Sequence, residues 1–208
     1  MEYKIGQLNW NESSRPVRNR HVPQIDRIRR QQWIRQAEGY LDLVMCLEDR
    51  WPLSQDLVDS MTSRALAKLQ KLGATSGRKS HVYFLQGQAY RVRREYENAI
   101  SAFWTSLETD SENIHTHLGL AWCYKRLNEI DLAIESLTSA FELDPANPVI
   151  SYNLACYWAL QGNVSQCCEF LIRAFELEEH FREFVDQERD FDPVRNHPHF
   201  QSITSVVA

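Results

Sequence analysis

The segment Gly73-Ala-Thr-Ser-Gly-Arg-Lys-Ser80 comes nearest to a catalytic motif in this 208-residue chain. A phosphate-binding loop requires Gly, four residues and then Gly-Lys-Ser/Thr after a strand, so that backbone N–H groups surround the phosphates. Here only three residues separate the glycines, Arg78 stands before Lys79, and the preceding residues have a helical pattern. We therefore predict a flexible joint between two helices, with Ser80 as an N-cap, and no nucleotide site.

Histidines and cysteines are the other candidates for metal or redox chemistry. His115-Thr-His117 and His197-Pro-His199 lack the i, i+4 spacing that places two imidazoles on one helix face. Five cysteines, including the adjacent Cys167-Cys168, form no Cys-x-x-Cys pair, which argues against a disulfide framework or a thiolate zinc site. No nucleophile and base stand in a recognisable context. We predict a non-enzymatic protein with no catalytic residue, metal or cofactor, in a reducing, cytoplasmic location.

The elements that position these side chains are predicted to be helices. Seven Gly and seven Pro leave little material for the turns of many short strands, and 43% hydrophobic residues are enough for a substantial core. No apolar run approaches the roughly 18 residues of a membrane-spanning helix. Residues 1–35 hold eight Lys/Arg against three Asp/Glu, whereas residues 36–208 hold 15 against 25. A basic N-terminal arm therefore precedes an acidic body.

The chain repeats itself at a fixed offset. Three segments align without gaps, and they begin at the evenly spaced residues Ser80, Ile114 and Pro148. Apolar residues recur every three to four positions in each half of a segment, which predicts two amphipathic helices per unit. Large and small positions recur together, in the sets Tyr90, Tyr124 and Trp158; Gly87, Ala121 and Ala155; Ala99, Ala133 and Cys167; Phe103, Leu137 and Leu171. No single hairpin buries its own apolar face, so the units are expected to stack.

These sets, together with Ala140-Phe-Glu-Leu-Asp-Pro145, resemble the tetratricopeptide repeat. Departures from its pattern are Ser106, Ser111, Cys167 and Glu179, which affect the outer units most. The resemblance implies an all-α, right-handed solenoid of helical hairpins. Its expected parts are an extended or disordered basic arm (1–24), a degenerate helical pair (25–72), three repeats (80–113, 114–147 and 148–179) and a C-terminal cap (180–208).

The expected cap begins with an amphipathic helix over residues 178–189. The segment that follows, from Asp190 to Phe200, resembles the end of many bacterial proteins of this family, in which a Phe-Asp-Pro turn leads into a short helix ending in Pro-x-Phe. Such a cap covers the last hairpin and presents one polar face to water.

If the hairpins stack as in the family, their first helices line a concave groove. The residues that the register places there include His81, Phe84, Gln88, Arg91, His115, Leu118, Trp122, Lys125, Tyr152 and Cys156. Trp122 is the expected anchor, because packing positions are already filled by its neighbours and exposed indoles are favoured in binding sites. Alternatively, Trp122 packs on the N-terminal segment of the chain. His81 and His115 occupy equivalent positions of neighbouring repeats. They are either part of a solvated polar surface, or they form a phosphate site, a metal site or a pH-sensitive contact.

The resemblance implies a protein-interaction adaptor that holds a peptide segment of a partner in this groove. The carboxylate clamp of the cochaperone branch is not carried over, because Phe84 replaces its Lys and Gln88 and Gly119 replace its Asn residues. Arg91 and Lys125 are expected to select the partner by charge. Two alternatives stay open, namely a secretion-type chaperone that dimerises through its N-terminal helices, and a nucleic-acid or membrane tether that uses the arginines of the arm. We favour neutralisation of those arginines by the acidic body, so no nucleic-acid partner is expected.

Overall fold

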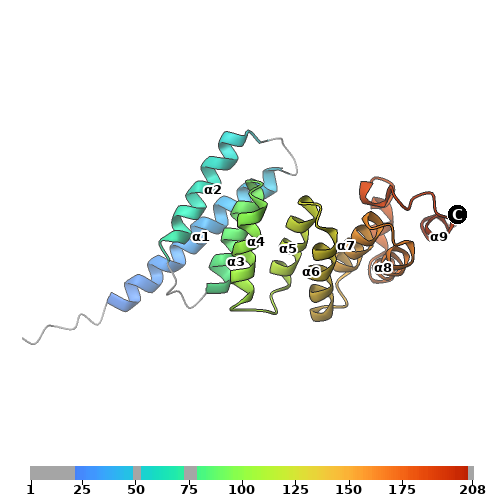
Figure 1. Ribbon diagram of the computed structural model, residues 1–208. Coiled ribbons are helices and arrows are strands. Elements are labelled where there is room, and N and C mark those ends of the chain that lie inside the picture. Colours follow the sequence, from blue (N-terminus) through green and yellow to red (C-terminus); the bar gives the residue numbers. More distant parts are fainter. Residues whose placement is uncertain (1–21, 49–52, 73–78, 206–208) are drawn as a thin grey trace, which may run out of the picture.

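The computed structural model describes residues 22–48, 53–72 and 79–205, and within these ranges the protein is all-α, without strands. The helices follow one another as antiparallel hairpins in a curved row (Figure 1). In chain order they are α1 (Val22–Glu48), α2 (Gln55–Gln70), α3 (Lys79–Val92), α4 (Tyr96–Leu107), α5 (Ile114–Arg126), α6 (Ile130–Leu143), α7 (Pro148–Leu160), α8 (Val164–Leu177), the 3₁₀ helices η2 (Glu179–Phe184) and η3 (Arg189–Phe191), and α9 (Pro198–Thr204).

Packing is strongest within the hairpins. α1 packs on α2, α3 on α4, α5 on α6 and α7 on α8, and each pair then packs on the next one along the chain. This arrangement confirms the predicted solenoid of helical hairpins, because each amphipathic pair covers its apolar face with its neighbours. None of the helices in the described ranges has the length and hydropathy that crossing a bilayer requires.

The corners inside the three hairpins are built alike. Arg94, Asn128 and Gly162, which stand at equivalent positions of the repeats, have positive φ angles of 63°, 63° and 78°. In each corner the next residue donates its backbone N–H to a carbonyl five residues earlier, as Glu95 does to Tyr90 at 2.9 Å. This is the Schellman arrangement, which satisfies the last carbonyls of the first helix. The short connections therefore repeat with the same period as the side chains.

We expect alanine to have opposite effects at two glycines. Gly162→Ala should lower the free energy of unfolding by about 1 kcal/mol, because a Cβ is strained at a positive φ. Gly39→Ala should raise it by about 0.5–1 kcal/mol, because Gly39 is exposed within α1 and a Cβ there meets no atom within 4 Å. Urea denaturation of both variants and the wild type measures the two changes in the free energy of unfolding. If both changes have the same sign, the positive φ of Gly162 does not limit that corner to glycine.

Small residues lie where the two helices of a hairpin cross. Ala99, Ala133 and Cys167 occupy the same repeat position and are completely buried. Burial, together with the neighbouring Cys168, raises the pKa of the Cys167 thiol to about 12. A buried thiol of this kind is unreactive. Cys167 therefore serves as a small apolar residue in place of alanine.

Ser106, which departs from the family pattern, joins a buried polar contact. Its hydroxyl donates to the carbonyl oxygen of Ser80 at 2.8 Å and lies 3.4 Å from Thr116 Oγ1. Helix α3 begins at Lys79, so Ser80 lies inside the helix. The predicted N-cap role of Ser80 is therefore wrong, and its backbone instead links α3 to α4. The predicted joint at residues 73–78 lies outside the described ranges.

The C-terminal cap differs from its expected local structure. Residues 179–184 form the 3₁₀ helix η2 instead of an α-helix extending to residue 189. A 3₁₀ helix aligns residues three apart, and it places Phe181 against Tyr152 with ring centroids 4.8 Å apart. Helix α9 begins at Pro198, whereas the sequence predicted a helix ending in Pro-x-Phe. Proline suits the first helical position because it has no N–H to satisfy.

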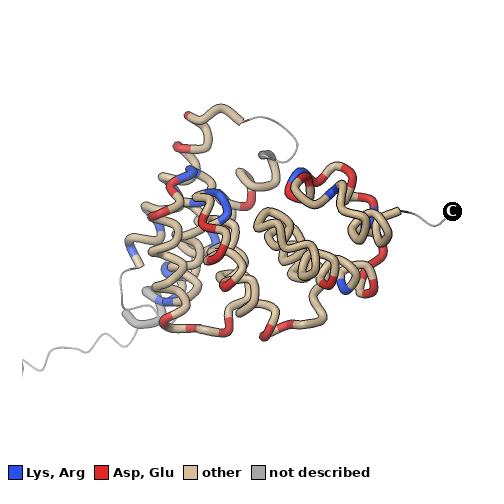
Figure 2. The backbone as a smooth tube through the Cα atoms, turned by 45° about the vertical axis from the view of Figure 1, so that its right-hand side comes forward, with Lys and Arg blue, Asp and Glu red and all other residues tan. Residues whose placement is uncertain are grey.

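The N-terminal arm is described only in part, since residues 1–21 lie outside the described ranges. Residues 22–24, predicted to belong to the arm, form the start of α1. The arginines at positions 27, 29, 30 and 35 are exposed, and α1 packs on α2 and α3. Figure 2 shows Asp and Glu prominent among the charged residues at the opposite, C-terminal end of the row. Helix α1 therefore meets the repeats mainly through α3, and neutralisation of the arginines by the acidic body stays a prediction.

Candidate functional site

A groove of about 410 Å³ runs along the first helices of the three repeats. α3, α5 and α7 contribute its floor, and the cap closes one end with Glu188 and Asp190. The sequence-predicted residues that line it are Phe84, Gln88, Arg91, His115, Leu118, Trp122, Lys125 and Cys156. They come from three separate helices. The repeat register therefore brings eight of the ten predicted residues onto one concave surface.

Trp122 lies half-buried in this groove and contacts two cations. The guanidinium carbon of Arg91 is 5.0 Å from the centre of the indole, and that of Arg126 is 5.5 Å away. The ring of Tyr96 meets the indole edge-on with a centroid distance of 5.6 Å. These ring contacts come from α3, α4 and α5. The alternative, packing of Trp122 on the N-terminal segment, stays open because residues 1–21 lie outside the described ranges. Cation–π contacts of this kind hold the indole in one orientation.

Arg91 connects the groove to the first helix of the protein. Its Nε–H donates to Gln88 Oε1 at 2.7 Å, and Nη2 lies 3.4 Å from the sulfur of Met45 on α1. Both partners fix the guanidinium above Trp122. The predicted pair of groove residues, Gln88 and Arg91, thus forms one polar unit at the α3 side of the groove.

Phe84 and the two repeat-related histidines form a short aromatic row. The Phe84 ring lies 6.3 Å from His81 and 6.5 Å from His115. His81 Nε2 is 2.7 Å from a carboxylate oxygen of Glu38 on α1, and His81 is absent from the groove lining. His115 does line the groove. The two histidines therefore have different surroundings in spite of their equivalent positions.

Lys125 is paired within the molecule. Its ammonium donates to a carboxylate oxygen of Asp190 in the cap and lies 5.4 Å from the centre of the Tyr157 ring. Glu188 in turn accepts the backbone N–H of Asp190 at 3.1 Å. The sequence predicted that Lys125 selects an acidic partner. The structure places a carboxylate of the cap against it, which leaves Arg91 as the other cation that lines the groove, while Arg126 contacts Trp122 without lining the groove.

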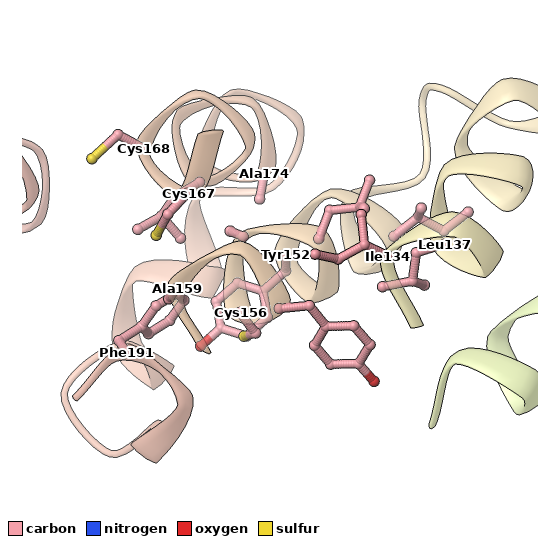
Figure 3. Close-up of a cluster of buried hydrophobic side chains, with 14 of the residues drawn as sticks. Ile134, Leu137, Tyr152, Cys156, Ala159, Cys167, Cys168, Ala174 and Phe191 are labelled. Atoms are coloured by element: carbon pink, nitrogen blue, oxygen red, sulfur yellow. The ribbon is translucent and has the colours of Figure 1, made fainter. Parts of the chain in front are cut away.

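Tyr152 lies in a different place from the other predicted residues, because the cap covers it. Its ring meets Phe181 at 4.8 Å and Phe191 at 5.7 Å, and only 7% of the residue is exposed. Figure 3 shows Tyr152 and Cys156 on α7 with Phe191 nearby. Burial raises the pKa of the Tyr152 hydroxyl well above its usual value. Tyr152 is therefore part of the contact between the last repeat and the cap.

Cys156 lies at the cap end of the groove and is buried. Its burial raises the pKa of the thiol well above the ordinary value, and the carboxylates of Asp190 and Glu188 raise it further, while Lys125 lowers it. Without another cation, the thiol stays protonated at neutral pH. Cys156 thus contributes a small, neutral sulfur surface to the groove.

The register argument as we applied it missed several lining residues, among them Leu137 on α6. Asn153 stands one repeat period after Gly119, so the period itself indicates its place on the groove face. Tyr157 follows Cys156 directly and reaches the groove from the same helix. Glu188 and Asp190 belong to the cap, outside the repeats, and no sequence period connects them to the groove.

The fold and the groove define the class of protein as a helical-hairpin solenoid with a concave face. The sequence model of the tetratricopeptide repeat matches residues 114–147, which are the residues of the second predicted unit. No curated protein matches the sequence. The chain therefore carries one recognised tetratricopeptide repeat, and the hairpins on either side of it have the same architecture.

Solved structures support this fold. A crystal structure of MamA superposes with a TM-score of 0.55 at 18% identity, covering 71% of this chain and 81% of that one. MamA AMB-1 gives 0.53 at 20% identity, covering 75% and 93%. TTC0263, a thermophilic TPR protein in Thermus thermophilus, gives 0.53 at 19% identity, covering 76% and 96%. At these identities the similarity concerns the fold alone.

Proposed function

We propose that this protein is a non-catalytic adaptor whose groove binds a peptide segment of a partner protein. The observation that carries the proposal is the position of Trp122, half-buried in a groove that Phe84 and Leu118 also line, with Arg91 and Arg126 in cation–π contact with its indole. An aromatic side chain fixed in advance loses little conformational freedom on binding. Binding hot spots are commonly aromatic residues of this kind.

The chemistry of the groove favours a guest with an apolar side chain beside an acidic one. The apolar group would cover Trp122 and Leu118, which line the groove. The acidic group would approach the guanidinium of Arg126, which is exposed next to the Trp122 ring. Repeat proteins of this architecture generally act as interaction modules, and we assign no catalytic residue in the groove. The five cysteines form no disulfide with one another, so we propose a reducing compartment such as the cytosol.

The proposal is tested by selecting peptides on the protein and then removing the anchor. We expect a phage library of random 12-residue peptides to yield binders, and Trp122→Ala to weaken a fluorescein-labelled binder by at least about tenfold in an anisotropy titration. Trp104→Ala is the matched control, because Trp104 is half-exposed on α4 and does not line the groove.

Equal losses in the two variants would contradict the placement of the site on Trp122. A selection that enriches no peptide on the wild-type protein would argue against peptide binding itself. Circular dichroism and the urea midpoint show whether each variant keeps the fold, so that a loss of binding is not mistaken for a loss of structure.

A further inference from the structure

Three potential ligand groups meet at the cap end of the groove. The sulfur of Cys156 and one carboxylate oxygen each of Glu188 and Asp190 all lie within 4.8 Å of one another. Cys156 belongs to α7, whereas the two acids lie in the cap, on either side of the start of η3. The fold, and not a local sequence motif, brings these groups together. Among the described residues, no other group of three or more His, Cys, Asp or Glu side chains has the spacing of a metal site.

A buried hydroxyl beside the cluster has no partner. Tyr152 precedes Cys156 by one helical turn, so both side chains lie on the same face of α7. The Tyr152 hydroxyl makes no hydrogen bond although the residue is 7% exposed. Figure 3 shows the Tyr152 ring and the Cys156 sulfur close together on the side of α7 that faces Phe191. Cys156, Glu188 and Asp190 all act electrostatically on this phenol. Buried hydroxyls are nearly always hydrogen-bonded, so the Tyr152 hydroxyl is available to pair with a bound group.

The charges around the cluster leave it short of a cation. Glu188 and Asp190 supply two carboxylates, and Lys125 supplies one ammonium, which contacts Asp190. Arg195 is nearby, but its guanidinium donates to the backbone oxygens of Glu188 and Val185 and to the carboxylate of Asp192. The side chain of Asp190 is only 13% exposed. A divalent cation would neutralise both carboxylates more completely than one ammonium does.

We propose that Cys156, Glu188 and Asp190 form a binding site for a thiophilic divalent cation of the Zn²⁺ type. A thiolate with two carboxylates is a donor set for zinc, whereas Mg²⁺ and Ca²⁺ prefer oxygen alone. The Cys156 thiol would release its proton to water as the ion binds. Three protein ligands leave one position of a tetrahedral ion open toward the groove. The Tyr152 hydroxyl would donate a hydrogen bond to an oxygen bound to the ion, and the ion would displace Lys125 from Asp190. This site goes beyond peptide binding and does not depend on it.

The test uses the full chain, freed of metal with a chelator and titrated with Co²⁺ and Zn²⁺. We expect one Co²⁺ per chain, a near-ultraviolet thiolate-to-cobalt absorption band, and loss of that band on addition of Zn²⁺. Mg²⁺ should neither bind nor remove the band. Cys156→Ser should abolish the band, and Glu188→Gln, at a half-exposed position that does not threaten the fold, should weaken Zn²⁺ binding at least about tenfold.

Two further variants make the assignment specific. Cys46→Ser is the matched control, because Cys46 is an exposed thiol on α1, and it should leave the band unchanged. Lys125→Met should tighten Zn²⁺ binding, since it removes the competing ammonium. The proposal is overturned by the absence of one-to-one binding, by a band that survives Cys156→Ser, or by a Lys125→Met variant that binds Zn²⁺ no more tightly than the wild type.

Discussion

Phe103→Ala is expected to lower the free energy of unfolding by about 3–5 kcal/mol, the range found when a fully buried aromatic residue is truncated. Phe103 is completely buried on α4, and its ring fills the space between α3 and α5. An added Cβ would lie 2.4 Å from a ring carbon of Phe103 at Gly87 and 2.7 Å from one at Gly119. The two glycines are therefore needed for the ring to fit. Urea denaturation followed by circular dichroism measures the loss.

A double-mutant cycle separates this contact from a general loss of packing. Gly87→Ala should destabilise the wild-type protein by about 1–3 kcal/mol, because its Cβ overlaps the ring. In the Phe103→Ala background the same change should be neutral or stabilising, since the cavity accepts the methyl group. Phe184→Ala is the matched control, because Phe184 is 45% exposed, and it should cost no more than about 1 kcal/mol. Additive effects of Gly87→Ala and Phe103→Ala would contradict the proposed contact.

Much of the fold could be predicted from the sequence because the structure has the same period as the residues. Ala99, Ala133 and Cys167 are small for one reason, the close crossing of two helices, and the reason recurs in every repeat. The corners at Arg94 and Asn128 recur in the same way, although neither residue is the glycine that such a backbone favours. A periodic chain repeats its local physics, so one unit predicts the others.

The candidate site could be predicted only as far as the repeats extend. A register places a side chain on a helix face, but it does not say what covers that face. Tyr152 has the same helical position as a groove residue and is nevertheless buried, because the cap packs Phe181 and Phe191 against it. Lys125 meets Asp190 across 65 residues of sequence. Contacts of this range depend on the path of the chain after the last repeat, and no period describes that path.

The cap therefore has more than one role in the structure. It covers the apolar end of the last hairpin, where a solenoid would otherwise expose its core to water. It also brings Glu188 and Asp190 to the groove, so that the end of the groove is acidic while the α3 side is basic through Arg91. The same segment thus contributes to stability, to the charge distribution of the groove and to the proposed metal site.

Phe191→Ala should lower the free energy of unfolding by about 3–5 kcal/mol, because it removes the ring that fills the space between the cap and the last repeat and leaves a cavity there. Phe191 is completely buried, and its ring lies 5.3 Å from Phe200 and 5.7 Å from Tyr152. The residue before it in the chain is Asp190, so the empty space should also free that carboxylate from Lys125. Urea denaturation reports the first effect.

Phe191→Leu is the matched control for that experiment, because it keeps an apolar side chain in the site and should cost less than Phe191→Ala. If the cap merely covers the solenoid, Phe191→Ala and Phe200→Ala should destabilise the protein and leave peptide binding to the groove unchanged. We expect Phe191→Ala to alter it as well, since the acidic end of the groove depends on the position of Asp190. If Phe191→Ala is still folded at the assay temperature and binds the peptide as the wild type does, the cap contributes to stability alone. If Phe191→Ala lowers the free energy of unfolding by less than about 1 kcal/mol, Phe191 is not a core residue.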